Sequence, residues 1–333
     1  MARSLFLGVD AGGTHTRSVL IDERGSVVAR GSAGAANHWT SSTSAAIGAV
    51  RSAIVSVLRA TGAPPPRTVT AVGIGWSGLE AAGSAADARR FVGDAVRATH
   101  CVLDSDVFAG HVGAFGGESG VLVAAGTGSI ALGVGDDGRR TRVGGWGHRY
   151  GDEGSAVWIA AEAIRAALRS ADGRDPPGPL WSALRRHAGV TPEADDALEQ
   201  VAPLVTTWLY APERHTSEVA TFARTVHELA EAGDVRSRAI LAAAGRELAQ
   251  LAHVAADRLA APTPIRLACS GGVWQHNPIV RETFREALAA APERFRLVEP
   301  IAPPDVGAAL MAMAASGRPL ASQEAPSVSR RRD

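Results

Sequence analysis

Short apolar runs alternate with a segment of helical periodicity along the first third of the chain. The runs end in turns rich in Gly, Asp or Pro, as buried strands do, whereas apolar residues around 47–58 recur at the spacing of an amphipathic helix. The expected elements are strands at 5–9, 17–21 and 26–30, a helix of about 18 residues around 47–58, a strand at 68–74, a helix over 84–98, a strand at 101–103 and a short helix over 107–114. The order β-β-β-α-β-α-β predicts an α/β domain with a mixed sheet.

The rest of the chain repeats the opening pattern and then becomes mostly helical. We expect strands at 121–125, at 130–134, in a segment ending near 143, at 265–269 and at 295–298, and helices over 155–167, 180–187, 194–209, 217–231, 235–260, 278–289 and 305–315. This predicts an N-terminal domain over 1–115, completed by a closing helix at about 304–316, a C-terminal domain over 116–303 with a helical insertion, and a disordered tail over 317–333.

A loop of glycine and hydroxyl residues follows the first strand of each unit. Glycine lets backbone N–H groups converge on an anion, and neighbouring hydroxyls can add to the contact. One such loop alone could equally be an ordinary hairpin turn, but a second copy favours two related half-domains that hold a phosphate chain between them. The glycines open hairpins and not helices, which excludes a dinucleotide fingerprint. The residues are Gly12, Gly13 and Thr14 in the first loop and Thr127, Gly128 and Ser129 in the second.

Composition narrows the classes of function. A chain of 333 residues with 46% hydrophobic and 20% charged residues is expected to form two globular domains of ordinary size. Its formal net charge of zero argues against a nucleic-acid partner. It has no apolar run long enough for a membrane span and no signal-peptide pattern, so we expect a cytoplasmic protein without a membrane partner. Cys101 and Cys269, on separate expected strands, are interpreted as buried thiols in a reducing compartment.

The chain contains no lysine, because every basic residue is arginine. A P-loop kinase needs the lysine of its phosphate loop, and Schiff-base chemistry needs an amine, so both are excluded. If the protein handles ATP, backbone amides, hydroxyls, arginine and a metal ion must hold the phosphates.

Several longer motifs carry a resemblance to a known family. They are Asn37-His38-Trp39, Asp106, GTGS at 126–129, GGWGHRYGDEGSAVWIA at 144–160 and CSGGVW at 269–274. With these motifs the chain resembles the superfamily of sugar kinases, heat-shock ATPases and actin. Within it, the chain is most similar to the N-acetylglucosamine kinase branch of the BadF/BadG/BcrA/BcrD-type ATPases. The resemblance implies an α/β fold of two actin-like (ribonuclease H-like) half-domains, each a mixed sheet with flanking helices, around an inter-domain cleft, with ATP and Mg²⁺ as cofactors.

Two aspartates are the candidates for the chemistry of such a kinase. Transfer of a phosphoryl group to a sugar hydroxyl needs a proton acceptor, and Asp106 lies at a strand end that faces the expected cleft. The alternative is that Asp106 only caps the following helix, and Asp104 is the competing base. Asp10, at the end of the first strand, is expected to position Mg²⁺ through water, since this ion keeps several waters when proteins bind it.

The sugar and the adenosine have candidate contacts of their own. Glycines around one tryptophan let backbone approach a ligand, and an aromatic face beside a carboxylate is a common way to hold a sugar. The resemblance implies that Gly145, Trp146, Gly147 and Asp152 contact the hexosamine, and that Asn37 joins them at the acetamido group. Gly271 and Gly272 resemble the adenosine-contacting loop of the superfamily, with a plain strand-to-helix turn as the alternative. Gly233-Asp234 could lie near the adenine or could form a helix cap.

We therefore expect an enzyme that uses ATP to phosphorylate the 6-hydroxyl of N-acetylglucosamine, with a small-molecule amino sugar as its partner. Glucosamine and N-acetylmuramic acid are the alternative substrates. A regulatory BadF-type ATPase is a rival, but it needs cysteines that ligate an iron–sulfur cluster at a subunit interface. A sugar sensor without catalysis should lack Asp106 or a phosphate loop, and this chain has both. The sequence leaves open the exact sugar, the preferred nucleotide and whether the protein forms a homodimer.

Overall fold

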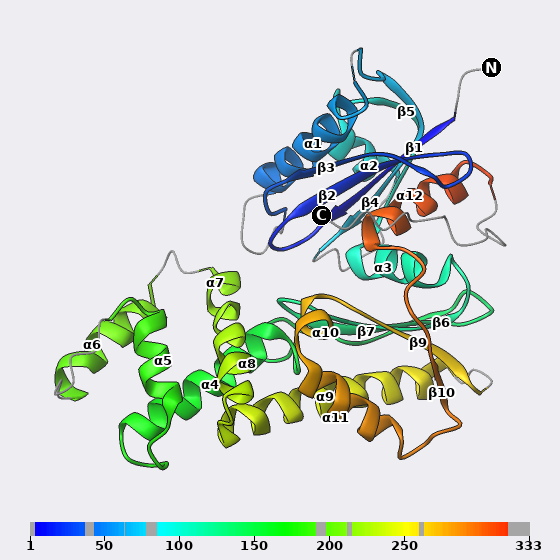
Figure 1. Ribbon diagram of the computed structural model, residues 1–333. Helices are drawn as coiled ribbons and strands as arrows, with labels where there is room; N and C mark the ends of the chain where they lie inside the picture. The colour runs from blue at the N-terminus through cyan, green and yellow to red at the C-terminus, as the bar shows by residue number, and fades with distance from the viewer. Residues whose placement is uncertain are drawn as a thin grey trace.

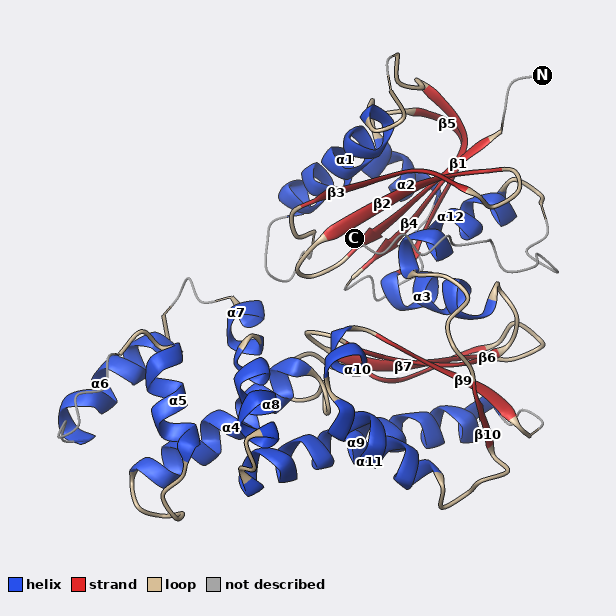
Figure 2. Ribbon diagram, viewed as in Figure 1, coloured by secondary structure: helices blue, strands red, loops and turns tan. Residues whose placement is uncertain are grey.

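Two five-stranded sheets with helices packed on their faces make up the fold (Figure 1). The computed structural model describes residues 4–36, 43–62, 64–77, 85–190, 198–211, 215–259 and 263–318. The strands and helices are shown by type in Figure 2, where the sheets form separate layers in the upper and lower halves of the molecule. The expectation of an α/β fold with two mixed sheets is confirmed.

The two sheets have the same topology. In the first, the order is β3-β2-β1-β4-β5, with β1, β2 and β3 antiparallel and β4 and β5 parallel to β1. In the second, the order is β10-β9-β6-β7-β8, with β6, β7 and β8 antiparallel and β9 and β10 parallel to β6. The strands are β1 (Leu5–Ala11), β2 (Thr16–Asp22), β3 (Val27–Ala33), β4 (Thr68–Trp76), β5 (Arg97–Ser105), β6 (Gly120–Ala125), β7 (Ser129–Val134), β8 (Arg140–Gly144), β9 (Ile265–Ser270) and β10 (Phe295–Leu297).

Helices cover both faces of each sheet and divide the core into separate clusters. α1 and α2 pack on one face of the first sheet and α12 on the other, whereas the second sheet packs against α4, α9 and α11 on one face and α3 on the other. α5 and α6 extend away from the second sheet, whereas α7 and α8 pack against α4, and α8 also packs against α9 (Figure 1). The bounds are α1 (Thr43–Arg59), α2 (Ala85–Val92), α3 (Asp106–Phe115), α4 (Ala156–Ala171), α5 (Pro179–His187), α6 (Leu198–Leu209), α7 (Thr216–Ala220), α8 (Phe222–Glu231), α9 (Val235–Leu259), α10 (Gly272–His276), α11 (Pro278–Leu288) and α12 (Pro304–Ala315).

Most expected elements are present, but two helices differ from the sequence prediction. The helix expected over 84–98 was wrong at its end: α2 stops at Val92, because Gly93 takes a left-handed φ of 52°, and β5 begins at Arg97. The single helix expected over 217–231 was also wrong. It is divided into α7 and α8 at Thr221, whose hydroxyl donates to the carbonyl of Glu218 at 2.5 Å. The short helix α10 was not predicted.

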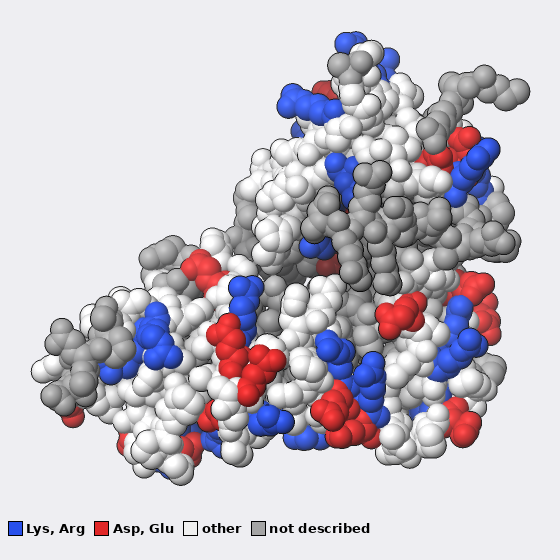
Figure 3. Space-filling view, viewed as in Figure 1, with Lys and Arg blue, Asp and Glu red and all other residues white. Residues whose placement is uncertain are grey.

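The distribution of surface charge and the apolar character of the helices can be compared with the partners that the sequence led us to expect. On the face drawn in Figure 3, acidic and basic side chains lie interspersed over the lower half of the molecule. In the described part of the chain, no helix combines the length and the apolar character that a membrane crossing requires.

The C-terminal helix α12 packs so closely that only glycine fits at the contacts. A Cβ added at Gly8 of β1 would lie 2.1 Å from the carbonyl oxygen of Asp305, and one at Gly73 of β4 would lie 2.0 Å from that of Ala308. On its other side, a Cβ at Gly307 would lie 1.9 Å from the carbonyl oxygen of Ala109 in α3. α12 is therefore held between the first sheet and α3 by contacts of backbone against backbone.

We expect Gly307→Ala to destabilise the protein by about 1–3 kcal/mol or more, because the added methyl group must push α12 away from α3. Gly48→Ala is the matched control: Gly48 lies on the exposed side of α1 with nothing within 4 Å of an added Cβ, so this change should stabilise by about 0.5–1 kcal/mol. Urea unfolding followed by circular dichroism measures both. Equal stability of the two variants would contradict the close packing of α12.

Candidate functional site

A cleft of about 2230 Å³ is lined by residues of both halves. On the side of the first sheet it lies at the carboxyl ends of the parallel strands β1, β4 and β5, the edge where open α/β sheets bind ligands. Asp10 is opposite Gly75 in the register of β1 and β4, and Trp76 is opposite Ser105 in that of β4 and β5. Asp10, Ser77 and Asp106 therefore lie at the ends of neighbouring strands, and all three line the cleft.

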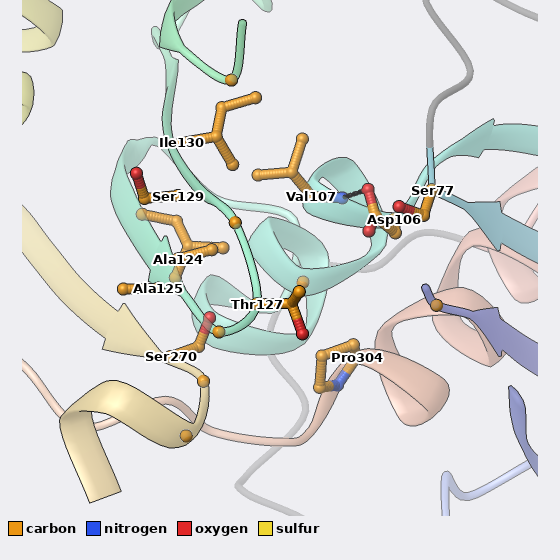
Figure 4. Close-up of a pocket in the computed structure, with 18 of the residues that line it drawn as sticks. Ser77, Asp106, Val107, Ala124, Ala125, Thr127, Ser129, Ile130, Ser270 and Pro304 are labelled. Carbon is orange, nitrogen blue, oxygen red and sulfur yellow. Dashed lines mark hydrogen bonds between the residues drawn. The ribbon is translucent and has the colours of Figure 1, made fainter. Parts of the chain in front are cut away.

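Asp106 is the first residue of α3 and sits beside Ser77 (Figure 4). Its carboxyl group accepts hydrogen bonds from the Ser77 side chain and from the backbone N–H of Val107, the latter at 2.8 Å. Desolvation raises the pKa of Asp106, and these hydrogen bonds partly oppose the rise. The capping role belongs to Ser105, whose hydroxyl accepts from the N–H of Phe108 at 3.3 Å. The Asp106 carboxyl can therefore act as a proton acceptor in the cleft.

Asp10 is the second acidic group of this edge. Desolvation, together with the charges of Asp106 and Asp305, raises the pKa of Asp10 from 3.8 to about 7, while Arg17 acts in the opposite direction. Asp305 is buried and pairs with Arg30 at 2.5 Å. Asp10 thus lies in an excess of negative charge that a cation beside it would relieve.

The other candidate base, Asp104, is already engaged by a cation. Its Oδ2 pairs with Nη1 of Arg140 at 2.7 Å, and its Oδ1 accepts the backbone N–H of Ser105 at 2.8 Å. Both oxygens of the Asp104 carboxylate are thus occupied by partners within the protein. This arrangement favours Asp106 over Asp104.

The two glycine and hydroxyl loops meet across the cleft. The hydroxyls of Thr14 and Thr127 lie 3.3 Å apart, although they belong to different sheets. The second loop rests on the start of α4, where the N–H groups of Ala156 and Val157 donate to the carbonyls of Gly126 at 2.9 Å and Thr127 at 3.2 Å. The loops are therefore close enough to hold one ligand between them.

A third turn, after β9, lies against the second loop. Gly271 has a φ of 105°, and a Cβ there would lie 2.4 Å from the carbonyl oxygen of Ala125, at the end of β6. Ser270 and Thr127 are drawn on adjoining loops in Figure 4, and Gly271 and Gly272 both line the cleft. This turn extends the wall of the cleft beyond the two loops that are the candidates for phosphate binding.

The segment between β8 and α4 carries the residues proposed to hold a sugar. Gly144, Gly145 and Gly147 have φ values of 74°, 70° and 87°, and they place the Trp146 side chain in the cleft with 78% of its surface exposed. Asp152 adopts a φ of 58°, alone among the described residues other than glycine. A non-glycine residue held in this region is strained, as residues at binding sites often are.

The carboxyl group of Asp152 joins this segment to the second phosphate-loop candidate. It accepts the N–H of Gly147 at 3.2 Å, and its Oδ2 lies 2.7 Å from the position that a Cβ of Gly128 would take. Desolvation raises the pKa of Asp152, because the side chain is buried, while the hydrogen bonds from Gly147 and Ser129 act against the rise. A substitution at Gly128 would therefore disturb both loops at once.

Apart from Gly233-Asp234, the cleft gathers every described residue that the sequence marked as a site candidate. They are Asp10, Gly12, Gly13, Thr14, Asp106, Thr127, Gly128, Ser129, Gly145, Trp146, Gly147, Asp152, Gly271 and Gly272. Asn37 lies outside the described residues. Gly233-Asp234 is a helix junction: the Asp234 carboxylate accepts the N–H of Ser237 at 2.8 Å, and neither residue lines the cleft. The individual roles of these residues remain predictions.

Sequence reasoning missed three contributors to the cleft. Ser77 could have been found, because it follows a strand whose parallel neighbours end at Ala11 and Ser105, next to Asp10 and Asp106. Arg140 had no local signal, since its partner Asp104 is on the other sheet. Thr216, at the start of α7, lies 3.5 Å from Nε2 of His148, so the helical insertion reaches the Trp146 segment.

Comparisons with known proteins agree on one family. The sequence model of the BadF/BadG/BcrA/BcrD ATPase family matches residues 7–312. An N-acetyl-D-glucosamine kinase of Dictyostelium discoideum is 25% identical over 326 residues, covering 94% of this chain and 99% of the relative. An N-acetylmuramic acid/N-acetylglucosamine kinase of Clostridium acetobutylicum is 31% identical over 172 residues, covering 51% of this chain and 53% of the relative. A crystal structure of a candidate N-acetylglucosamine kinase from Chromobacterium violaceum superposes with a TM-score of 0.74 at 27% identity, covering 92% of this chain and 98% of the other.

The raised pKa of Asp10 predicts how its removal changes stability with pH. Because the folded pKa is above the unfolded one, the stabilising contribution of the protonated carboxyl is complete below pH 3.8 and is lost as the pH rises through about 7. Asp10→Asn should therefore gain stability relative to the wild type as the pH rises between these values, by about 1.4 kcal/mol per pH unit at most.

Urea unfolding of both proteins at a series of pH values, without divalent cations, measures this gain. Asp136→Asn, at an exposed turn, is the control and should show no such trend. A difference between Asp10→Asn and the wild type that stays constant with pH would contradict the assignment.

Proposed function

The chain belongs to the BadF/BadG/BcrA/BcrD ATPase family, and from this premise we propose that it is an ATP-dependent kinase that phosphorylates the 6-hydroxyl of N-acetylglucosamine. The observation that carries the proposal is the Asp106 carboxyl, with its raised pKa, in the same cleft as the two glycine and hydroxyl loops. The relatives named as N-acetylglucosamine kinases support the choice of sugar. We propose the domain division at residues 115 and 116, with α12 completing the first domain and residues 317–333 as a tail.

The nucleotide would lie across the loops of both sheets. The amides of Gly13 and Gly128 and the hydroxyls of Thr14 and Thr127 would bind phosphate oxygens, in place of the lysine that this chain lacks. Gly12 and Ser129 would shape the two loops, since the Gly12 N–H donates to the carbonyl of His15 at 3.1 Å and the Ser129 hydroxyl donates to that of Glu153 at 2.7 Å. Gly271 and Gly272 would approach the adenosine. Because the hydroxyls of Thr14 and Thr127 are only 3.3 Å apart, one phosphate chain can contact both loops.

Magnesium fits the acidic edge of the first sheet. Mg²⁺ takes one or two carboxylates, several waters and the phosphates of the substrate, so a single protein carboxylate is sufficient. Among the residues that the structure describes, no three His, Cys, Asp or Glu side chains are grouped to hold a metal. Asp10, in its excess of negative charge, would hold the ion through water. The ion would offset the charge of the phosphates.

Asp106 would supply the base. Its carboxylate accepts the proton of the sugar hydroxyl while the sugar oxygen bonds to the γ-phosphorus and the bond from that phosphorus to the bridging oxygen of ADP breaks. The hydrogen bond from Ser77 holds the carboxylate in one orientation, and the raised pKa increases its basicity near neutral pH.

The sugar would lie against Trp146, with Gly145, Gly147 and Asp152 around it and Asn37 at the acetamido group. Asp152 can accept hydroxyl hydrogen bonds and contacts the phosphate loop at Gly128, so it would connect sugar binding to the nucleotide site. An N-acetylmuramic acid kinase is the second candidate. Arg149 is exposed in the same segment and lines the cleft, where it could pair with the lactyl carboxylate of that sugar.

The rival regulatory ATPase is disfavoured by the cysteines. The sequence has two, Cys101 on β5 and Cys269 on β9, and burial raises the pKa of both thiols, that of Cys269 to about 12. A cluster ligand must be a thiolate, and a thiol with a raised pKa resists deprotonation. A sugar sensor is disfavoured because Asp106 and both loops are present together in the cleft.

The substrate assignment predicts an order of activities. N-acetylglucosamine should exceed both glucosamine and glucose in kcat/KM, because a site built for an acetamido group leaves its own polar atoms unpaired when the group is absent. An ADP-release assay over these sugars and N-acetylmuramic acid gives the order directly. Asn37→Ala should narrow the gap between N-acetylglucosamine and glucosamine. A higher kcat/KM for glucosamine, or an unchanged ratio in Asn37→Ala, would contradict the assignment.

Asp106→Asn should lower kcat by about 10²–10⁴-fold and leave sugar binding nearly intact, because the side chain keeps its shape and loses its basicity. Steady-state kinetics give kcat, and calorimetric titration with the sugar gives the Kd. The kcat of Ser77→Ala should lie between those of Asp106→Asn and the wild type, since this change removes one hydrogen bond to the Asp106 carboxylate. An Asp106→Asn variant with more than half of the wild-type activity would remove Asp106 from the mechanism.

The division of the loops between nucleotide and sugar is tested at two neighbouring glycines. A Cβ at Gly126 meets nothing within 4 Å, so Gly126→Val should keep the fold and raise the KM for ATP by roughly tenfold, or about 1.4 kcal/mol. A Cβ at Gly128 meets the Asp152 carboxylate at 2.7 Å, so Gly128→Ala should also raise the KM for the sugar. If Gly126→Val changes the KM for the sugar alone, the assigned division is wrong.

A further inference from the structure

Arg140 connects the second sheet to the chain segment that carries Asp106. It is the first residue of β8, the edge strand of that sheet. Its Nη1 lies 2.7 Å from Oδ2 of Asp104, at the end of β5, and its Cζ lies 3.3 Å from the ring centroid of Phe108, in the first turn of α3. Asp104 and Phe108 stand two residues before and two residues after Asp106, so one guanidinium contacts both sides of the β5–α3 junction.

The junction itself is connected by hydrogen bonds. Asp104 accepts the N–H of Ser105 at 2.8 Å, and Ser105 in turn accepts the N–H of Phe108 at 3.3 Å as the cap of α3. Moving the Asp104 carboxylate therefore moves the cap and the first turn of the helix. Asp106 lies inside this short network.

The other end of the connection leads to the phosphate-loop candidate. β8 pairs with β7, with Arg140 opposite Val134, and β7 begins at Ser129, the last residue of the loop 126–129. A continuous path thus runs from the loop through two paired strands to Arg140 and from there to Asp104 and Phe108. It connects the loop to the segment that carries Asp106.

We propose that Arg140 is a positioning residue for phosphoryl transfer, which holds the β5–α3 junction in register with the second sheet so that Asp106 keeps its place relative to the loop 126–129. This inference rests on the proposed kinase function. Arg140 acts through Asp104 and Phe108 and makes no contact of its own with the reacting atoms. A direct phosphate ligand would behave differently, because its loss would weaken the binding of ATP.

The ion pair is too exposed to contribute much to folding, since 43% of the Arg140 side chain is accessible. Its loss should therefore appear in kcat and not in the melting temperature. A small misplacement of a reacting group can lower the rate by as much as about 10²-fold. We expect Arg140→Met to lower kcat by roughly 10- to 100-fold, with both KM values and Tm close to those of the wild type.

The matched control is Arg139→Met, which removes the same charge one residue earlier. Arg139 donates to the carbonyl of Leu259 at 2.7 Å and does not line the cleft, so this variant should keep the wild-type kcat. Arg140→Lys keeps a cation for Asp104 and should recover part of the lost kcat. The kcat of the double variant Asp104→Asn, Arg140→Met should be little lower than that of the worse single variant, because the two residues act as a unit.

Three results would overturn the inference while the wild type transfers phosphate to an amino sugar. They are a wild-type kcat in Arg140→Met, a raised KM for ATP with unchanged kcat, and losses in the double variant that simply multiply. Absence of transfer to any amino sugar by the wild-type protein would instead overturn the proposed function, and this inference with it.

Discussion

The packing of α3 between the two halves is the constraint on which the rest of the structure depends. On one side, α3 packs against α12 and against the segment that leads into α12. A Cβ at Gly113 would lie 2.8 Å from the carbonyl oxygen of Ala302 in that segment. On the other side, Val107 and Phe115 pack with Leu122 and other apolar residues of the second sheet. Because the helix is fixed on both sides, its first residue, Asp106, is fixed relative to both walls of the cleft.

The shared topology of the sheets explains why the polar groups meet. Each half places a hairpin loop after its first strand, and the common strand order brings the ends of the parallel strands to the cleft. The first half supplies carboxyl groups at Asp10 and Asp106, and the second supplies glycine-rich backbone around Thr127 and Gly271. In the proposed reaction, proton acceptance and cation binding therefore belong to one sheet, and most of the contacts to phosphate and sugar belong to the other.

The sequence alone located the strands and loops well because their signals are local. The apolar run before Gly12, its repeat before Gly126 and the glycines around Trp146 can all be read without knowledge of distant contacts. The C-terminal end of α2 and the break at Thr221 were missed, since helical periodicity does not show that a glycine takes a left-handed φ or that a hydroxyl donates to a carbonyl of the preceding turn.

The connections between distant segments could not be predicted in the same way. The Arg140–Asp104 pair depends on how strands from separate halves are placed, and the contact of Gly128 with Asp152 depends on how two loops of the second half fold together, which no local pattern encodes. The candidate base itself came from resemblance to a family. Ser77 was within reach of reasoning, because three parallel strands end at one edge and Ser77 follows the middle one in sequence, at the edge where Asp10 and Asp106 also lie.

The central claim is that the protein moves the γ-phosphoryl group of ATP to the 6-hydroxyl of an N-acetylated amino sugar. A two-dimensional ¹H–³¹P correlation spectrum of the product formed from ATP and N-acetylglucosamine tests this most directly, because it shows which sugar protons are coupled to the new phosphorus. The account predicts coupling to the two protons on carbon 6. Coupling to the anomeric proton, or release of inorganic phosphate with no sugar phosphate formed, would contradict it.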